Sequence, residues 1–289
     1  MTALLSLSLS FLHRIGLYWQ LTKPRLSLVV VFSAMMGALV AGLSEGMSLL
    51  WLALGGYAIT GAANAANQIW ERDSDALMER TRSRPLPAGL LSPVEGVIVA
   101  LTLFVVGIGM LSLVRWEVAL LGGVAWALYV LAYTPLKKHG PIAVLVGAFP
   151  GALPPVIGYW AVRPEVSPVL VALFVLQFVW QFPHFWVIAL LAQGDYARAG
   201  FRLLPFSPEK AQANRLALWL SVWALPVAAL ALWPFLPWQV GLWSFSIGLP
   251  VAFLSGGWVY GTNPKNLRYL LLALTAYLTF LYLGIWLLL

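Results

Sequence analysis

The sequence predicts an all-α integral membrane protein with about nine transmembrane helices. The chain has 289 residues, of which 61% are hydrophobic and only 9% charged, a composition foreign to water-soluble domains. Apolar runs recur along its whole length, and about 20 such residues cross the hydrocarbon core as a helix. Fifteen Trp and ten Tyr are enough for aromatic belts at both membrane interfaces.

Nine apolar segments follow one another, and each has the length of a single span. They lie at residues 26–44, 49–70, 94–113, 117–133, 142–162, 168–191, 211–233, 237–260 and 267–288. The first dozen residues are apolar without a basic start, which favours an interfacial helix over a secretory signal. No linker or soluble domain interrupts the series, so we expect residues 1–289 to form a single intramembrane domain.

The fifth segment is rich in helix-breaking residues. It contains Pro150, Pro154 and Pro155 together with Gly147 and Gly151. Such a pattern predicts a kinked helix, and kinks are tolerated where neighbours or a cavity satisfy the freed backbone groups. We therefore expect this helix to line a pocket.

The distribution of Lys and Arg orients the helices. With the N-terminus in the cytoplasm, the cytoplasmic side receives all but two of the 17 basic residues, and only Arg115 and Arg163 fall on the far side. Cytoplasmic loops carry such an excess, so after nine spans the C-terminus is expected outside. This orientation accounts for the net charge of +7 without nucleic acid as a partner. The absence of Cys excludes disulfides, thiolate metal sites and a cysteine nucleophile.

The stretch NQIWERDSDALMERTRSRPLPAG, which follows the second segment, is unusually charged for this chain. Asn67, Glu71 and Asp75 are four residues apart, so on a helix of about 3.6 residues per turn they share one face, which Asp73 does not. Oxygen ligands on one face suit a hard cation such as Mg²⁺. Carboxylates at a membrane are costly and mark a functional site. We call Asn67, Glu71 and Asp75 the polar stripe and predict that it holds Mg²⁺.

Arginines follow the polar stripe at once, at positions 80, 82 and 84. Arg binds phosphate bidentately, and Mg²⁺ commonly binds through one or two carboxylates plus substrate phosphates. The stripe and the arginines together predict a diphosphate site with Arg80 and Arg84 as ligands. The alternative is a solvated loop whose charges pair with one another.

Four stretches occur in an order that is typical of one family. They are LTKPR at 21–25, the N-x-x-x-[D/E]-x-x-x-D pattern with RTRSRPL, YTPLKKHGPIAVLVGAFPGALPPVIGYWAV at 133–162, and WQFPHFWVIALLAQGDYARAGFRLLP at 180–205. Together they resemble the intramembrane prenyltransferases of the UbiA superfamily, and within it the protoheme IX farnesyltransferase (haem O synthase) branch. The chain departs from the usual pattern in having Glu71 for the first Asp, and Gln193 and Gly194 before the second acidic motif.

This resemblance implies a fold and a reaction. It implies nine helices around a central cavity open to the cytoplasm and to lipid, in a bacterial inner membrane. The farnesyl group of farnesyl diphosphate would pass, with Mg²⁺, to a vinyl group of haem B, and addition of water would give haem O. It also implies a catalytic role for the polar stripe and for Asp195 in the second acidic motif. Partners would include haem A synthase or terminal oxidase assembly factors.

Further candidates each leave two interpretations open. His184 is the only His within an apolar segment, and its imidazole either binds haem iron or packs against a neighbouring helix. Lys137 and Lys138 either bind diphosphate or haem propionates, or simply set the orientation in the membrane. The same choice applies to Lys23 and Arg25.

Two other functions remain as alternatives at this point. The first is prenylation of an aromatic acid or quinone precursor, which needs the same diphosphate site. The second is a membrane transporter, but transporters often have helices broken near the midplane. Here the charged stretch lies at one membrane surface instead.

Overall fold

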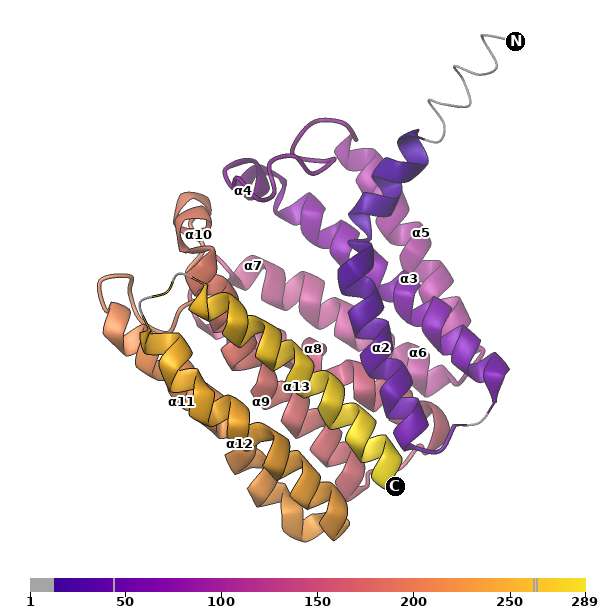
Figure 1. The fold of residues 1–289 in the computed structure, drawn as a ribbon. Coiled ribbons are helices and arrows are strands. Elements are labelled where there is room, and N and C mark those ends of the chain that lie inside the picture. Colours follow the sequence, from indigo (N-terminus) through magenta and orange to yellow (C-terminus); the bar gives the residue numbers. More distant parts are fainter. Residues whose placement is uncertain (1–12, 44, 262, 264) are drawn as a thin grey trace.

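The computed structural model describes residues 13–43, 45–261, 263 and 265–289, and within these ranges it is helical without strands. The interfacial helix expected in the first dozen residues lies outside them. Among the described residues, eight helices are long and apolar enough to cross a membrane. A ninth span results if the helices His13–Leu21 and Pro24–Val40, bent by 50° at Thr22 and Lys23, count as one. The all-α membrane fold is thereby confirmed (Figure 1).

The helices follow the predicted segments in order. They are α2 (Pro24–Val40), α3 (Gly46–Trp70), α5 (Pro93–Ser112), α6 (Trp116–Ala127), α8 (Ile142–Val162), α9 (Pro168–Leu191), α11 (Ala211–Leu232), α12 (Trp238–Tyr260) and α13 (Asn266–Leu288). The fourth span continues from α6 through a π-helix, η1 (Leu128–Tyr133), into α7 (Thr134–Leu136). Short helices occupy three connections: α4 (Arg72–Ala76), α10 (Gln193–Ala199) and the 3₁₀ turn η2 (Trp233–Phe235).

Local sequence explains where several helices begin. Helices α2, α5 and α9 each have Pro in their first turn, where its missing N–H costs nothing. Before α5, the Ser92 hydroxyl accepts a hydrogen bond from the Glu95 backbone, and the Glu95 carboxylate accepts one from the Ser92 backbone. This capping box fixes the start of α5.

Helix α8 is the most buried of the eight single spans, and it packs against α2, α6, α9 and η1. It runs unbroken from Ile142 to Val162 through all three prolines. Pro155 has no N–H for the carbonyl of Gly151, and Gln177 of α9 donates to that oxygen at 2.7 Å instead. A side-chain amide thus replaces the missing backbone bond inside the bundle.

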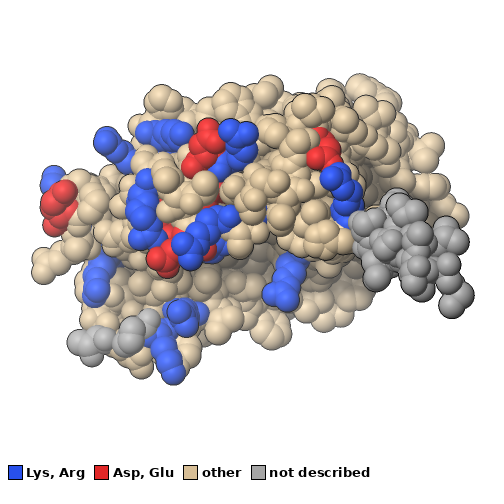
Figure 2. Space-filling view, turned by 90° about the horizontal axis from the view of Figure 1, so that it is seen from above, with Lys and Arg blue, Asp and Glu red and all other residues tan. Residues whose placement is uncertain are grey.

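The connections that carry the charged residues meet at one end of the bundle. Helices α4, α7 and α10 all lie at this end in Figure 1. Seen from above, acidic and basic side chains mingle over its surface (Figure 2). Polar contacts join these connections directly: Lys137 pairs with Glu71, and the backbone N–H of Arg202 donates to the carbonyl of Lys137 at 3.2 Å.

Candidate functional site

The polar stripe spans the junction of α3 and α4 rather than lying on one helix. Helix α3 ends at Trp70, and α4 begins at Arg72. Helical bonding nevertheless continues across the break, because the Glu71 N–H donates to the Asn67 carbonyl and the Asp75 N–H to the Glu71 carbonyl. The three side chains are buried together, with 1%, 6% and 0% of Asn67, Glu71 and Asp75 exposed. Asp73 instead lies outside in an exposed pair with Arg72.

Each stripe residue contacts a basic side chain, and the three basic residues come from different segments. The contacts are Lys23 Nζ to Asn67 Oδ1 at 2.9 Å, Lys137 Nζ to Glu71 Oε1 at 2.7 Å, and Arg84 Nη1 to Asp75 Oδ2 at 2.7 Å. These contacts lie at the charged end of the helix bundle and are only partly exposed to water. The structure therefore brings acids and bases together as a buried cluster and not as a solvated loop.

Lys137 and Lys138 differ in environment although they are neighbours. Lys137 is buried, with its Nζ 4.7 Å from the Tyr133 ring centroid, whereas Lys138 is exposed. Burial opposes the charge of Lys137, but the Glu71 carboxylate together with Tyr129 and Tyr196 outweighs it and raises the pKa of Lys137 above its usual value. Lys137 therefore stays protonated at neutral pH and loses its charge only when the pH rises through that raised pKa.

The oxygens of the polar stripe fit a magnesium ion whose coordination shell is completed by oxygens of a bound phosphate. Asp75 Oδ1 is buried and has no hydrogen-bond partner, so one carboxylate oxygen is available. Across the described residues, no three His, Cys, Asp or Glu side chains cluster as a complete metal site. Mg²⁺ needs few protein ligands, since it commonly takes one or two carboxylates plus phosphate oxygens and water. Glu71 and Asp75 with the amide of Asn67 provide that number.

Lys23 is the contact that the sequence did not single out from its neighbour Arg25. Its backbone is left-handed, with φ 46° and ψ 65°, and Pro24 follows it. Such a conformation is costly for a non-glycine residue, and such costs cluster at functional sites. The bend turns Lys23 inward onto Asn67, while Arg25 stays exposed. The only sequence signal was a Lys directly before Pro.

Polar residues around Asn67 and Asn64 support the bend and the stripe. Asn67 Nδ2 donates to Thr134 Oγ1 at 3.2 Å, and Thr134 Oγ1 donates to the carbonyl of Tyr129 in η1. Asn64 donates to the Thr22 carbonyl and to Ser27 Oγ. Thr134 fixes the orientation of Asn67, while Asn64 fastens α3 to the bend before α2. Sequence reasoning missed Thr134, because nothing in the order of residues places it beside Asn67.

Of the two predicted arginine ligands, only Arg84 reaches the polar stripe. Arg84 is half-buried through its pair with Asp75, and its backbone N–H donates to the Thr81 carbonyl. Arg80 is exposed. Thr81 in turn donates its hydroxyl to the Asp75 carbonyl at 2.8 Å, which holds the loop against α4.

Asp195 connects α10 to the loop after α4. Its carboxylate accepts hydrogen bonds from the Glu79 backbone at 3.0 Å and from the Arg198 guanidinium, and Arg198 also donates to the Leu77 carbonyl. Burial would raise the pKa of the Asp195 carboxyl, but these hydrogen bonds outweigh it and lower the pKa below its usual value. Asp195 is therefore ionised at neutral pH, and its contacts here are with Glu79 and Arg198 and not with the stripe.

His184 lies within α9, away from these ion pairs. Its ring stacks on Trp180 with centroids 4.5 Å apart, and Trp180 donates to the Leu274 carbonyl of α13. The Nδ1 atom of His184 is buried without a hydrogen-bond partner. The structure thus gives His184 a packing role against Trp180 and leaves one ring nitrogen uncommitted.

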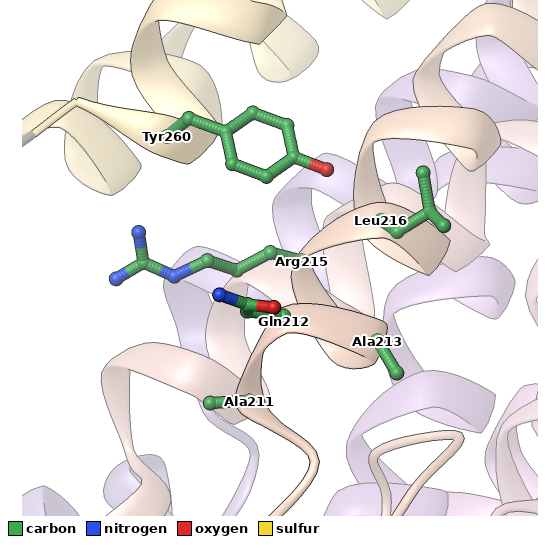
Figure 3. Close-up of a pocket in the computed structure, with 6 residues that line it drawn as sticks. All are labelled: Ala211, Gln212, Ala213, Arg215, Leu216 and Tyr260. Atoms are coloured by element: carbon green, nitrogen blue, oxygen red, sulfur yellow. The ribbon is translucent and has the colours of Figure 1, made fainter.

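A cavity of about 600 Å³ lies elsewhere, between the start of α11 and the end of α12. Figure 3 shows Arg215 approaching it from α11 and Tyr260 from α12. Arg215 already donates to the Val259 carbonyl at 3.1 Å. None of the predicted site residues lines this cavity.

Comparison with known proteins agrees with this picture. Residues 30–268 match the model of the UbiA prenyltransferase family. The chain is 40% identical over 240 residues to a protein from Cytophaga hutchinsonii named protoheme IX farnesyltransferase, covering 82% of this chain and 83% of that protein. A protein of the same name from Flavobacterium johnsoniae is 35% identical over 275 residues, covering 91% of this chain and 90% of the relative.

Solved structures share the fold at low sequence identity. A UbiA homolog from Archaeoglobus fulgidus bound to GPP and Mg²⁺ superposes with a TM-score of 0.67 at 15% identity, covering 93% of this chain and 99% of the other. A structure of digeranylgeranylglyceryl phosphate synthase gives a TM-score of 0.71 at 15% identity, covering 95% and 98%. The helical bundle buries the polar stripe at one end, and the family match covers most of the length of the chain. The chain therefore belongs to the UbiA prenyltransferase family.

Proposed function

We propose that the protein transfers the farnesyl group of farnesyl diphosphate to a vinyl group of haem B, with addition of water, and so makes haem O. The relatives that cover most of the chain carry the name protoheme IX farnesyltransferase, which supplies both the donor and the acceptor. The observation that carries the proposal is the buried polar stripe with its free Asp75 oxygen. Such a site suits an anion that is held partly through a cation.

In this proposal the diphosphate lies among the basic side chains that now contact the stripe. Lys137 and Arg84 bind its oxygens, Lys23 approaches from the bend before α2, and the exposed Arg80 and Lys138 are outer contacts. Asn67, Glu71 and Asp75 hold Mg²⁺. When bound, Mg²⁺ neutralises the diphosphate and makes it a better leaving group.

The protein's own residues then orient the reacting groups. The allylic C–O bond breaks and its electron pair leaves with the diphosphate, next to Lys137 and Arg84. The Tyr133 ring lies beside Lys137 and against the Tyr129 ring, and both rings shield the cationic farnesyl carbon. The vinyl π electrons of haem B form the new C–C bond, water adds to the resulting cation, and a proton is released. Asp195 keeps α10 closed against the α4 loop.

The location in the cell follows from charge. We infer a bacterial inner membrane with the charged end of the bundle in the cytoplasm, the N-terminus inside and the C-terminus outside, because all but two basic residues lie on that side. Haem B and farnesyl diphosphate then reach the site from the cytoplasm or from lipid. Haem A synthase or terminal oxidase assembly factors would receive the product.

Product mass analysis tests the proposal. The purified protein in detergent receives farnesyl diphosphate, Mg²⁺ and equal amounts of haem B and 4-hydroxybenzoate. The proposal expects farnesylated, hydrated haem as the product. Prenylated hydroxybenzoate with unmodified haem would favour the quinone-precursor alternative, and the absence of any prenyl transfer would favour a transporter.

A further inference from the structure

The two carboxylates of the polar stripe are already neutralised by the protein itself. Glu71 pairs with Lys137 and Asp75 with Arg84, both at 2.7 Å. The pairs are largely shielded from water, with 8% of the Glu71 side chain, 11% of Lys137, 1% of Asp75 and 23% of Arg84 exposed. Within each pair the two charges cancel, so both carboxylates are compensated by the protein without any ligand.

Because the carboxylates are already paired, Mg²⁺ or diphosphate binding alone would encounter a like charge of the protein. A Mg²⁺ ion at Glu71 and Asp75 would bring two positive charges next to Lys137 and Arg84. A diphosphate at Lys137 and Arg84 would bring its negative charges next to the two carboxylates. In a site of low dielectric constant, like charges at such distances are strongly unfavourable. Either ligand alone must therefore break an ion pair and leave a buried charge uncompensated.

The two ligands together remove both conflicts. Mg²⁺ takes over the carboxylate oxygens, the diphosphate takes over the ammonium and guanidinium groups, and the ligands neutralise each other. Each ion pair is exchanged for two new charge-assisted contacts.

We propose that Lys137 and Arg84 are resident counter-ions that make the binding of Mg²⁺ and of diphosphate mutually dependent. The proposal rests on the proposed function only in taking a magnesium diphosphate as the ligand. As a consequence, the carboxylates stay paired with Lys137 and Arg84 until a prenyl diphosphate binds together with Mg²⁺. Coupling of this kind is reciprocal: each ligand raises the affinity for the other by the same factor.

Calorimetric titration of the protein in detergent measures this coupling without any reaction. The titrants are MgCl₂, pyrophosphate, and the preformed magnesium pyrophosphate complex. We expect the wild type to bind the complex about 5–150-fold more tightly than either component alone. Lys137→Gln should bind MgCl₂ alone at least about fivefold more tightly than the wild type, and the complex more weakly. Lys210→Gln, which removes an exposed positive charge at the same end, is the matched control and should bind all three like the wild type.

Two results would overturn the proposal. One is a wild type that binds MgCl₂ alone as tightly as the complex, and the other is a Lys137→Gln variant with unchanged affinity for MgCl₂. If Lys137→Gln does not purify in folded form, Arg84→Gln carries the same test, with the exposed Arg202→Gln as its control. Because no haem or farnesyl group is present, a failure here leaves the proposed reaction untouched. Conversely, if the two ligands bind cooperatively but haem is not farnesylated, only the proposed acceptor is wrong.

Discussion

In the proposed mechanism, the carboxylates of the polar stripe have two partners, a cation of the protein and a magnesium ion. Glu71 shows the consequence most clearly, because its carboxylate is buried and paired with the buried Lys137. Removing one partner of a buried pair leaves the other charge uncompensated, which costs about 3–5 kcal/mol. A loss of activity at Glu71 must therefore be separated from a loss of folded protein.

Glu71→Gln should abolish farnesyl transfer, because the amide lacks the negative charge that holds Mg²⁺ beside the leaving group. Glu71→Asp should keep partial activity, since the charge stays and only its reach is shortened. Initial rates are compared at saturating Mg²⁺ and at equal amounts of folded protein, as judged by size-exclusion chromatography. Wild-type rates in Glu71→Gln would refute the role of this carboxylate as a metal ligand.

His184 offers a prediction about the acceptor. If its unpartnered Nδ1 or its Nε2 binds haem iron, His184→Ala should shift the Soret band of bound haem B and weaken its binding. If the ring only packs on Trp180, the spectrum should stay unchanged while stability falls modestly. Titration of wild type and variant with haem B in detergent distinguishes the two, with Trp180→Phe as the control for lost stacking.

Charge patterning predicted which segments carry the site but not which side chain of each segment points inward. Lys137 and Lys138 are equivalent in the sequence, and so are Lys23 and Arg25, yet only the first of each pair reaches the stripe. The choice depends on backbone geometry: α7 follows a π-helix, and Lys23 takes a left-handed conformation. Neither feature has a periodic signal in hydropathy, and the residue before a proline normally avoids helical conformations.

At the scale of helices, apolar runs located the spans well because hydrocarbon thickness fixes their length. The second segment, predicted at 49–70, begins three residues earlier in α3, and the fifth, predicted at 142–162, coincides with α8. The charged stretch that follows the second segment contains the separate short helix α4. That short helix is held by the loop directly after it, since Thr81 and Arg84 both bond to Asp75. Sequence periodicity alone cannot show such support.

The contact of α2 with α8 depends on small residues. A Cβ atom on Gly158 would lie 1.7 Å from the carbonyl oxygen of Ala34, so any side chain there forces the helices apart. Gly158→Ala should lower the melting temperature, at a cost of about 1–3 kcal/mol, the range for overpacked cores. Gly109→Ala in α5, where nothing lies within 4 Å of the added atom, is the control. It should be neutral or stabilising by up to about 1 kcal/mol. Equal melting temperatures for the two variants would contradict this packing.

For the whole molecule, orientation in the membrane follows from the uneven distribution of Lys and Arg. The chain has no Cys, so a single introduced thiol reports its own location. His139 and Glu165 are exposed on loops that precede and follow α8. In intact spheroplasts, a membrane-impermeant maleimide should label Glu165→Cys at once and His139→Cys only after permeabilisation. The reverse pattern would place the charged end of the bundle outside the cytoplasm.

We propose that the buried polar stripe at the charged end of the bundle carries farnesyl transfer to haem. The decisive measurement is haem O formation by the wild type and by Asp75→Asn, followed by product mass. Both reactions contain identical amounts of folded protein, haem B, farnesyl diphosphate and Mg²⁺. Asn keeps the size of Asp75 and removes only its charge, which Arg84 and Mg²⁺ both require. We expect haem O from the wild type and none above background from Asp75→Asn. Haem O from both proteins at equal rates would contradict it.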